Sequence, residues 1–370
     1  MAKQLKEKLL AKKIFSAPNY KRGLSTGSTL VNLACSGKPT VGFLPGKYIF
    51  LVGDSASGKT FLALTMLAEA SINPEYKDYR LIYDNAEDGA LMDLRKFFGE
   101  KLLKRIEAPK MVSGDPDFTP MPVPKEMVFS TTVEVFYDNL DDAFRAEKPF
   151  IYVLDSMDSL SSEDEQDKFA EQKAARRKGK DAAGSYGDGK AKKNSSNLRQ
   201  AVHRLKETGS ILIIIAQTRD NLGFGAQFNP KTRSGGRALR FYATEELWFS
   251  IKEGIKKTVH GKPRKIGTVL QIQVKKNRQT GREPTVEVPF YPSFGFDDVG
   301  SCVDFLIEEK RWNKEGTAYN AAELSLHGSE ESLVKQIEEQ GKETELRLLV
   351  AEVWQEIEEA CGIERKRRYE

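Results

Sequence analysis

Cysteine, histidine and tryptophan are scarce in this sequence. The chain has 370 residues and only three of each. The cysteines and histidines lie far apart, at Cys35, Cys302, Cys361, His203, His260 and His327. Zinc sites normally use close groups of such ligands, so the spacing argues against a metal centre of that kind. An odd number of distant cysteines favours reduced thiols in a cytoplasmic protein, and the histidines are expected to be structural or exposed.

Long apolar runs are also missing. No run approaches the roughly 20 residues that a membrane-spanning helix needs, so we expect no membrane partner. The N-terminal MAKQLKEKLLAKK is basic but lacks the apolar centre of a signal peptide, and it is typical of an amphipathic helix. The formal net charge of +4 is too small to indicate nucleic-acid binding by itself. Apolar residues form 39% of the chain, which is enough for a packed core.

Short apolar runs alternate with helix-like segments. Four runs are continuous, as expected for strands buried on both faces of a parallel sheet, and they cover residues 47–52, 80–83, 150–154 and 211–215. Helical patterns lie around residues 60–70, 89–105, 136–146 and 196–207. This alternation predicts an α/β fold with a mostly parallel central sheet flanked by helices. Two later β-rich runs, 244–251 and 268–276, are expected to extend the sheet.

The chain is expected to divide into three parts. Residues 1–40 are interpreted as an N-terminal helix and lead-in segment used in oligomerisation, and residues 41–300 as the core. Residues 301–370 are interpreted as a small helical C-terminal domain. Within the core, residues 161–195 are first acidic, then basic, then small and polar, which predicts a mobile loop.

Residues 53–60, GDSASGKT, match the phosphate-binding pattern G-x-x-x-x-G-K-[ST]. The pattern follows an apolar strand and opens a helix, which is the context that makes it specific. Its glycines let the backbone N–H groups and the helix N-terminus face the phosphates. Lys59 would reach the β- and γ-phosphates, and the Thr60 hydroxyl would hold Mg²⁺. The predicted nucleotide-binding residues are Gly53, Asp54, Ser55, Ala56, Ser57, Gly58, Lys59 and Thr60.

Polar side chains also follow the other three strands. Asp155 could hold the metal together with Thr60, although an ordinary strand-ending aspartate gives the same pattern. Gln217 follows the fourth strand. A carboxylate near the γ-phosphate could activate water, and the sequence leaves three candidates open: Asp84, Glu87 and Asp88. Because ligands of open α/β sheets bind beyond the carboxyl ends of the strands, we expect all these groups to converge.

With these motifs the chain resembles a RecA-type recombinase, within the family of RecA-fold ATPases. The similar segments follow the family's order: LSTGSTLVNLA (24–34), DNAED (84–88), VLDSMDSL (153–160), IIIAQTR (213–219), GGRALRFYA (235–243), VKKNR (274–278) and FGFDDVGSCVDFLIEEKRWNKEGTAY (294–319). GGRALRFYA is more specific than the phosphate-binding loop, which many ATPase families share. The resemblance implies a RecA-like core that binds ATP and Mg²⁺ at the interfaces of a homo-oligomer.

The resemblance also implies particular roles. Glu87 would be the catalytic carboxylate, and Gln217 would sense the γ-phosphate and pass that state to the loop at about 218–236. The loop would bind single-stranded DNA through backbone groups, positive charge and apolar wedges. The implied DNA-binding residues are Arg219, Leu222, Phe224, Phe228, Lys231, Arg233, Gly235 and Gly236. Without the resemblance, a surface loop that tucks onto the domain would be the simpler interpretation.

A basic pair lies two residues apart near the end of a predicted strand. The resemblance implies that Lys276 and Arg278 reach across the subunit interface to the neighbour's nucleotide and stabilise charge on its γ-phosphate. Hydrolysis would then require assembly. A solvated strand end is the alternative for these two residues.

Several segments depart from the family pattern. The first DNA-binding loop of the family is short, whereas the equivalent region here, residues 161–195, is long and charged. Within it Lys190, Lys192 and Lys193 could contact DNA phosphates. Residues 108–129 also fit the family poorly, and no adenine-contacting residue is identified. The chain ends in a basic stretch, where bacterial members commonly carry an acidic tail. These departures indicate a diverged member of the family, of the kind a phage could encode.

The sequence thus favours a DNA-dependent ATPase that polymerises on single-stranded DNA as a helical filament and promotes pairing and strand exchange with duplex DNA. We expect it in the cytoplasm, associated with the nucleoid or in an infected host cell. Two alternatives remain open. One is a hexameric helicase or translocase of the same fold. The other is a DNA-binding mediator that uses ATP only as an assembly switch.

Overall fold

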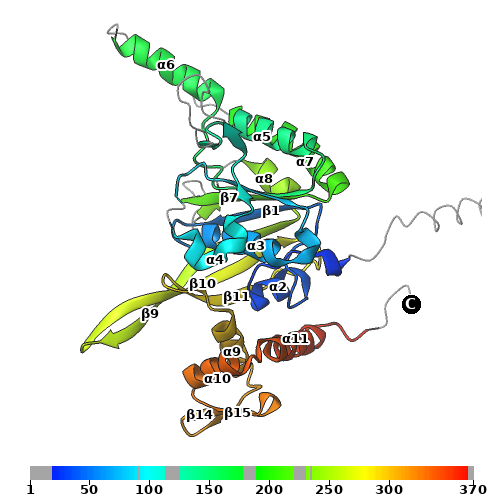
Figure 1. The fold of residues 1–370 in the computed structure, drawn as a ribbon, viewed down its shortest axis with the longest axis vertical. Helices are drawn as coiled ribbons and strands as arrows, with labels where there is room; N and C mark the ends of the chain where they lie inside the picture. Colours follow the sequence, from blue (N-terminus) through cyan, green and yellow to red (C-terminus); the bar gives the residue numbers. More distant parts are fainter. Residues whose placement is uncertain are drawn as a thin grey trace, which may run out of the picture.

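The computed structural model describes residues 19–89, 92–112, 126–177, 189–220, 231–233 and 236–365. Its centre is a ten-stranded sheet in the order β12–β11–β10–β9–β1–β7–β6–β2–β3, with β8 paired to β7 (Figure 1). The strands are β1 (Tyr48–Gly53), β2 (Arg80–Asp84), β3 (Ile106–Glu107), β6 (Phe150–Leu154), β7 (Ile211–Asp220), β8 (Lys231–Arg233), β9 (Glu245–Val259), β10 (Lys262–Asn277), β11 (Thr285–Tyr291) and β12 (Gly295–Phe296).

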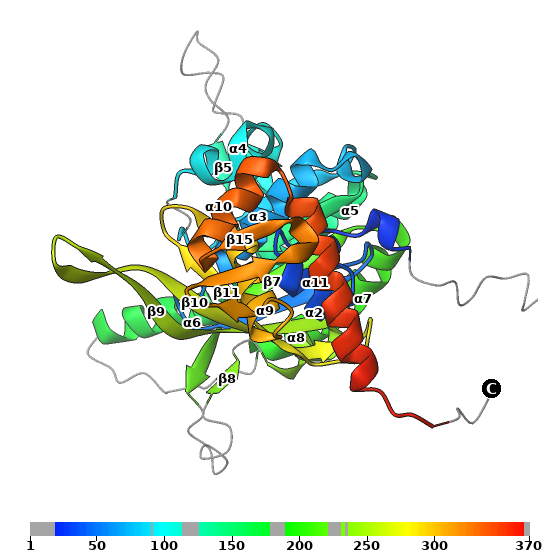
Figure 2. The ribbon, with the colours of Figure 1, turned by 90° about the horizontal axis from the view of Figure 1, so that it is seen from below.

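The sheet has a parallel half and an antiparallel half. Strands β9, β1, β7, β6, β2 and β3 pair in parallel, whereas β9 to β12 form an antiparallel meander. Each predicted strand is present, and the α/β class is confirmed. Strands β9 and β10 are much longer than predicted, because together they form a hairpin that extends beyond the sheet (Figure 2).

Side chains of the central strands alternate between two hydrophobic clusters. Ile213 and Ile215 lie in the first cluster, while Leu212 and Ile214 lie in the second. Both clusters are closed to solvent, which explains why these strands are continuous apolar runs. Helices cover both faces of the sheet: α2 (Thr29–Ser36), α3 (Lys59–Ile72) and α4 (Leu94–Leu103) on one, and α5 (Val133–Arg145), α7 (Gly189–Thr208) and α8 (Arg237–Tyr242) on the other.

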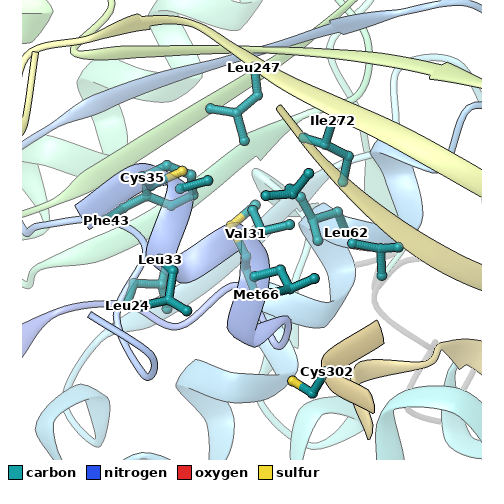
Figure 3. Packing of buried hydrophobic residues seen from close by; sticks show 14 of the residues in the cluster. Leu24, Val31, Leu33, Cys35, Phe43, Leu62, Met66, Leu247, Ile272 and Cys302 are labelled. Carbon is teal, nitrogen blue, oxygen red and sulfur yellow. The ribbon is translucent and has the colours of Figure 1, made fainter. Parts of the chain in front are cut away.

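The first cluster joins the lead-in segment and the C-terminal part of the chain to the sheet. Figure 3 shows Val31 and Cys35 of α2 packed near Met66, with Cys302 below them. Helix α9 (Asp298–Glu308) contributes Cys302 to this cluster. Burial raises the pKa of both thiols well above its usual value, in keeping with the expected reduced state.

The C-terminal part was expected to be helical, and this is only partly correct. It contains α9, α10 (Glu330–Gln340) and α11 (Glu343–Ala360), together with a three-stranded sheet of β13 (Lys314–Glu315), β14 (Ala318–Ala321) and β15 (Leu326–Gly328). These strands are only two to four residues long, so they are too short for alternating polarity to identify them. In the described part of the chain, no helix is long and apolar enough to cross a membrane.

The expectation of a loop at residues 161–195 was wrong for much of this region. Helix α6 (Glu163–Arg177) extends away from the body, and α7 begins at Gly189. Helix α6 starts with a capping box, in which the Glu165 N–H donates to Ser162 Oγ and the Ser162 N–H donates to Glu165 Oε2, over 3.2 and 3.1 Å. Acidic residues in its first turn also complement the helix dipole.

The segment 218–236 does not start as a loop. Strand β7 continues through Gln217 to Asp220, and β8 pairs with its last three residues in antiparallel fashion. Another short hairpin, β4 (Lys110–Val112) with β5 (Glu126–Val128), lies in the region that fits the family poorly. The expected amphipathic helix within residues 1–18 lies outside the described residues.

Candidate nucleotide-binding site

Four parallel strands end at one edge of the sheet, as the sequence predicted. Gly53 at the end of β1 is in register with Gln217 of β7, and Asp84 of β2 is in register with the last residue of β6. Asp155 follows immediately after β6. The phosphate-binding loop and the polar strand ends therefore face a common site.

The glycines of the phosphate-binding loop are required by its close packing. Gly58 has φ +88°, and a Cβ there would lie 2.6 Å from Leu270 Cδ1. A Cβ on Gly53 would lie 2.6 Å from the Phe249 carbonyl oxygen. Helix α3 begins directly after Gly58, so its N-terminal N–H groups point into the loop. This is the geometry needed to bind phosphate.

Lys59 is buried within the loop. Its ammonium group donates hydrogen bonds to the carbonyl oxygens of Gly53 and Asp54, over 2.9 and 2.6 Å, and to Ser57 Oγ over 3.3 Å. Burial lowers the pKa of Lys59, and the neighbouring carboxylates, first Asp155, counter that effect. A positive charge therefore lies at the end of a helix that already favours anions.

The two residues predicted to hold a metal, Thr60 and Asp155, lie side by side. Thr60 Oγ1 donates to Asp155 Oδ2 over 2.7 Å, and the Tyr83 hydroxyl donates to the same oxygen over 2.9 Å. Burial raises the pKa of Asp155, while these two hydrogen bonds lower it. Across the residues that the structure describes, no three His, Cys, Asp or Glu side chains gather as metal ligands. A hydroxyl and one carboxylate fit Mg²⁺, which is held mainly through substrate phosphates and water.

The structure separates the three candidate carboxylates. Asp84 is buried and accepts hydrogen bonds from the backbone and side chain of Ser130 and from Tyr152, over 2.8, 2.6 and 2.7 Å, so its role is structural. Asp88 is exposed in a turn with φ +52°. Of the three, Glu87 is the one that bonds to β7: its carboxylate accepts a hydrogen bond from Gln217 Nε2 over 3.1 Å.

Several residues of the site had no role assigned from sequence. Ser156 Oγ donates to Glu87 Oε2 over 2.9 Å, and Asp158 accepts the Gln217 backbone N–H over 2.6 Å. Thr218 Oγ1 donates to the Asp54 side chain, which ties β7 to the phosphate-binding loop. Ser156 and Asp158 lie in the segment VLDSMDSL, so the density of hydroxyl and carboxyl groups after that strand was the available signal.

The basic pair contacts the end of α8 within the same chain. Lys276 Nζ donates to the carbonyl oxygens of Arg240 and Phe241, over 2.6 and 3.0 Å, and Arg278 donates to the Phe241 carbonyl over 3.0 Å. The two side chains therefore point in one direction, as expected, and they satisfy carbonyls at a helix C-terminus. Burial lowers the pKa of Lys276 to about 8, and the charge of Arg278 adds to this effect.

The structure describes some of the predicted DNA-binding residues and leaves out others. Arg219, Lys231 and Arg233 lie on the paired strands β7 and β8, and Gly236 caps α8 with φ +83°. Leu222, Phe224, Phe228 and Gly235 lie outside the described residues. In the other candidate region, Lys190 and Lys192 lie on α7. Lys193 pairs with Glu134 and, over 3.3 Å, with Asp164, so its charge is largely used within the chain.

The chain is similar to known proteins of one family. Residues 173–295 match the family model of the RecA N-terminal domain. The chain is 25% identical over 329 residues to protein RecA of Lactiplantibacillus pentosus, covering 87% of this chain and 73% of that protein. It is 26% identical over 317 residues to the mitochondrial DNA repair protein recA homolog 3 of Arabidopsis thaliana, covering 83% of this chain and 62% of that longer relative.

Proposed function

Because this chain is a diverged relative of RecA, we propose that it is an ATP-dependent recombinase that polymerises on single-stranded DNA and promotes homologous pairing and strand exchange. The relatives support recombination and DNA repair in general terms. One observation carries the finer proposal: Glu87 at the nucleotide site is hydrogen-bonded to Gln217, and the strand that holds Gln217 continues into the predicted DNA-binding segment.

The nucleotide would be held by the phosphate-binding loop. Lys59 would exchange its hydrogen bonds to loop carbonyls for bonds to the β- and γ-phosphates. Thr60 Oγ1 and Asp155 Oδ2, which are 2.7 Å apart, would hold Mg²⁺. The metal would offset the negative charge that develops on the phosphates. Tyr83 would keep Asp155 oriented through its hydrogen bond.

Glu87 would orient and activate the attacking water. Its carboxylate is exposed at the site, and Ser156 and Gln217 fix its direction with one hydrogen bond each. If the γ-phosphate attracts the Gln217 amide, the end of β7 and the segment after it respond. Coupling of this kind is reciprocal, so DNA should raise the affinity for ATP as ATP raises the affinity for DNA.

Assembly would complete the catalytic site. Lys276 and Arg278 contact α8 of their own chain, and α8 directly follows the predicted DNA-binding segment. In a helical filament, the pair would leave these carbonyls and approach the neighbour's γ-phosphate. Hydrolysis would then depend on both DNA and polymerisation.

The test is ATP hydrolysis with and without single-stranded DNA, with the same samples imaged in a non-hydrolysable ATP analogue. DNA-stimulated hydrolysis together with helical filaments would support the proposal and justify a strand-exchange assay. Closed rings with directional unwinding would favour a helicase or translocase. Residues 161–195, which include helix α6, stand where the family has a short loop, and they leave one second candidate, a DNA-binding mediator, which would show binding and slow turnover without strand exchange.

A further inference from the structure

The hairpin of β9 and β10 projects from the sheet as a free two-stranded arm. Strand β9 pairs with β1 only up to Phe249, and β10 pairs with β11 only from Thr268 onward. Between these points the two strands pair only with each other. We call residues 255–266 the β-arm; it lies clear of the body in two views (Figures 1 and 2).

A two-residue turn closes the β-arm. Val259 pairs with Lys262, and the residues between them, His260 and Gly261, have φ +52° and +73°. Positive φ at both positions is the geometry of a type I′ turn, whose twist matches that of the two strands. The β-arm is therefore a well-formed hairpin that reaches about 16 Å beyond Ile255, since a strand rises about 3.3 Å per residue.

The β-arm is strongly basic and contains no acidic residue. In the pairing register, Lys256 lies opposite Lys265, and Lys257 lies opposite Arg264. The two pairs point to opposite faces because side chains alternate along a strand, and Lys262 shares the face of Arg264. All five side chains are exposed, and within the described residues none of them forms an ion pair with a carboxylate.

This arrangement costs stability in the free chain. Like charges directly opposite each other on paired strands repel, and the β-arm has two such pairs. The charges nearer the body are arranged differently, since Lys252 on β9 pairs with Glu287 over 2.5 Å. The β-arm thus carries positive charge without a carboxylate partner among the described residues, in the part of the hairpin that leaves the molecule, where an anionic partner could approach both faces.

We propose that the β-arm binds duplex DNA by entering a groove with both of its faces towards phosphates. The major groove is about 12 Å wide and admits a two-stranded ribbon. Its two walls carry phosphates, so a ribbon inside it is flanked by negative charge on both sides, which matches the two basic faces. A single strand would engage one face only. This inference rests on the proposed function, and it assigns a surface to the duplex that a recombinase must bind.

The test compares two full-length variants that lose the same charge. The arm variant carries Lys256→Gln, Lys257→Gln, Arg264→Gln and Lys265→Gln. The control variant carries four exposed substitutions elsewhere: Lys77→Gln, Lys101→Gln, Lys104→Gln and Lys335→Gln. Binding to a fluorescent duplex and to a single strand of equal length is measured by anisotropy over a range of salt concentrations. Thermal unfolding confirms that each variant folds, and hydrolysis stimulated by single-stranded DNA reports separately on the proposed function.

We expect the arm variant to bind duplex DNA at least about tenfold more weakly than the unaltered chain, with a salt slope lower by up to about 3.6, since each of the four lost phosphate contacts removes about 0.9. The control variant should stay within about twofold, and stimulation by single-stranded DNA should persist in both. The proposal is overturned if the unaltered chain does not bind duplex, if the arm variant binds it normally, or if both variants lose affinity equally. Loss of self-assembly with normal duplex binding would instead make the β-arm a contact between copies. Absence of stimulation in the unaltered chain would count against the proposed function alone.

Discussion

The side-chain amide of Gln217 donates a hydrogen bond to the Glu87 carboxylate over 3.1 Å, although the two residues are 130 positions apart. Gln217 lies within β7 and Glu87 follows the end of β2; these two strands lie on either side of β6 in the sheet. Asp158, which follows β6, accepts the Gln217 backbone N–H over 2.6 Å. Gln217 is thus held at both its backbone and its side chain, and a displacement of β7 would reach Glu87.

Replacing Gln217 by Ala should uncouple DNA binding from hydrolysis. The variant loses the hydrogen bond to Glu87 but keeps the carboxylate, so basal hydrolysis should change by less than about fivefold. Stimulation by single-stranded DNA should fall by about tenfold or more, as expected for a coupling free energy of 1–3 kcal/mol. Turnover with and without DNA measures both effects. An equal loss of basal and stimulated rates would mean that Gln217 serves the chemistry itself.

Glu87→Gln should abolish most hydrolysis while nucleotide binding persists. Loss of a positioned general base typically slows turnover about 10²- to 10⁴-fold. Asp88→Asn is the matched control, because Asp88 is the adjacent exposed carboxylate and should matter little. Single-turnover hydrolysis and binding of a fluorescent ATP analogue distinguish the two steps. If Asp88→Asn were the slower variant, the catalytic role would belong to that residue.

The sequence was sufficient to predict the parallel strands and the phosphate-binding loop. Both depend on local features: continuous apolar runs, and glycines at a fixed spacing before a lysine. The sequence could not rank Asp84 and Glu87, which are three residues apart at the end of the same strand. Their difference depends on Ser130 and Tyr152, which surround Asp84 from distant parts of the chain.

Polar and charged composition gave wrong or missing predictions for two segments that lie outside the core, α6 and the β-arm. Helix α6 was expected to be a loop because its composition is polar, yet Ser162 and Glu165 form a capping box that could have been recognised. The β-arm was not predicted, because only the inner part of each strand carries the apolar pattern of a sheet. Strand pairing, rather than burial, maintains the outer part of that hairpin.

Lys59→Ala should eliminate nucleotide-dependent assembly. The substitution removes the only buried ammonium group of the phosphate-binding loop, so affinity for ATP should fall by at least about tenfold, as for other charged hydrogen bonds of 1.5–3 kcal/mol. Light scattering with and without ATP measures assembly, and a binding titration measures affinity. Lys77→Ala, an exposed lysine beyond the end of α3, is the control. Undiminished ATP turnover in Lys59→Ala would refute the assignment of the loop.

The double variant Lys276→Ala, Arg278→Ala should fold and bind nucleotide normally but lose DNA-stimulated hydrolysis. The stimulated rate should fall by about 10³-fold, as it does when other basic residues that act on a neighbour's phosphate are removed. The pH dependence gives a second measurement. Because burial lowers the pKa of Lys276 to about 8, its charge is lost as the pH rises through that value, and stimulated turnover should fall with it. Lys276→Arg should keep its charge and extend activity to higher pH. Unchanged turnover in the double variant would exclude a role across the interface.

Glu245 should make the stability of the chain depend on pH. This residue is fully buried in β9, and burial raises its pKa to about 8, against the nearby charges of Lys47, Lys276 and Arg278. In the unfolded chain a glutamate titrates near about 4.3. Between these values the native state holds a proton that the unfolded state has lost, so the free energy of unfolding should fall as the pH rises, by roughly a few kcal/mol in total.

Glu245→Gln tests this directly, because the amide is neutral at every pH. Urea unfolding at pH 5, 6, 7 and 8 should give a decline in stability for the unaltered chain and a much flatter profile for the variant. Glu253→Gln is the control, since Glu253 is exposed on the same strand and should leave the decline in place. Parallel profiles for the unaltered chain and Glu245→Gln would show that Glu245 is ionised in the native state. Its charge would then be available to hold Lys276 protonated, and the fall in DNA-stimulated turnover should move to higher pH.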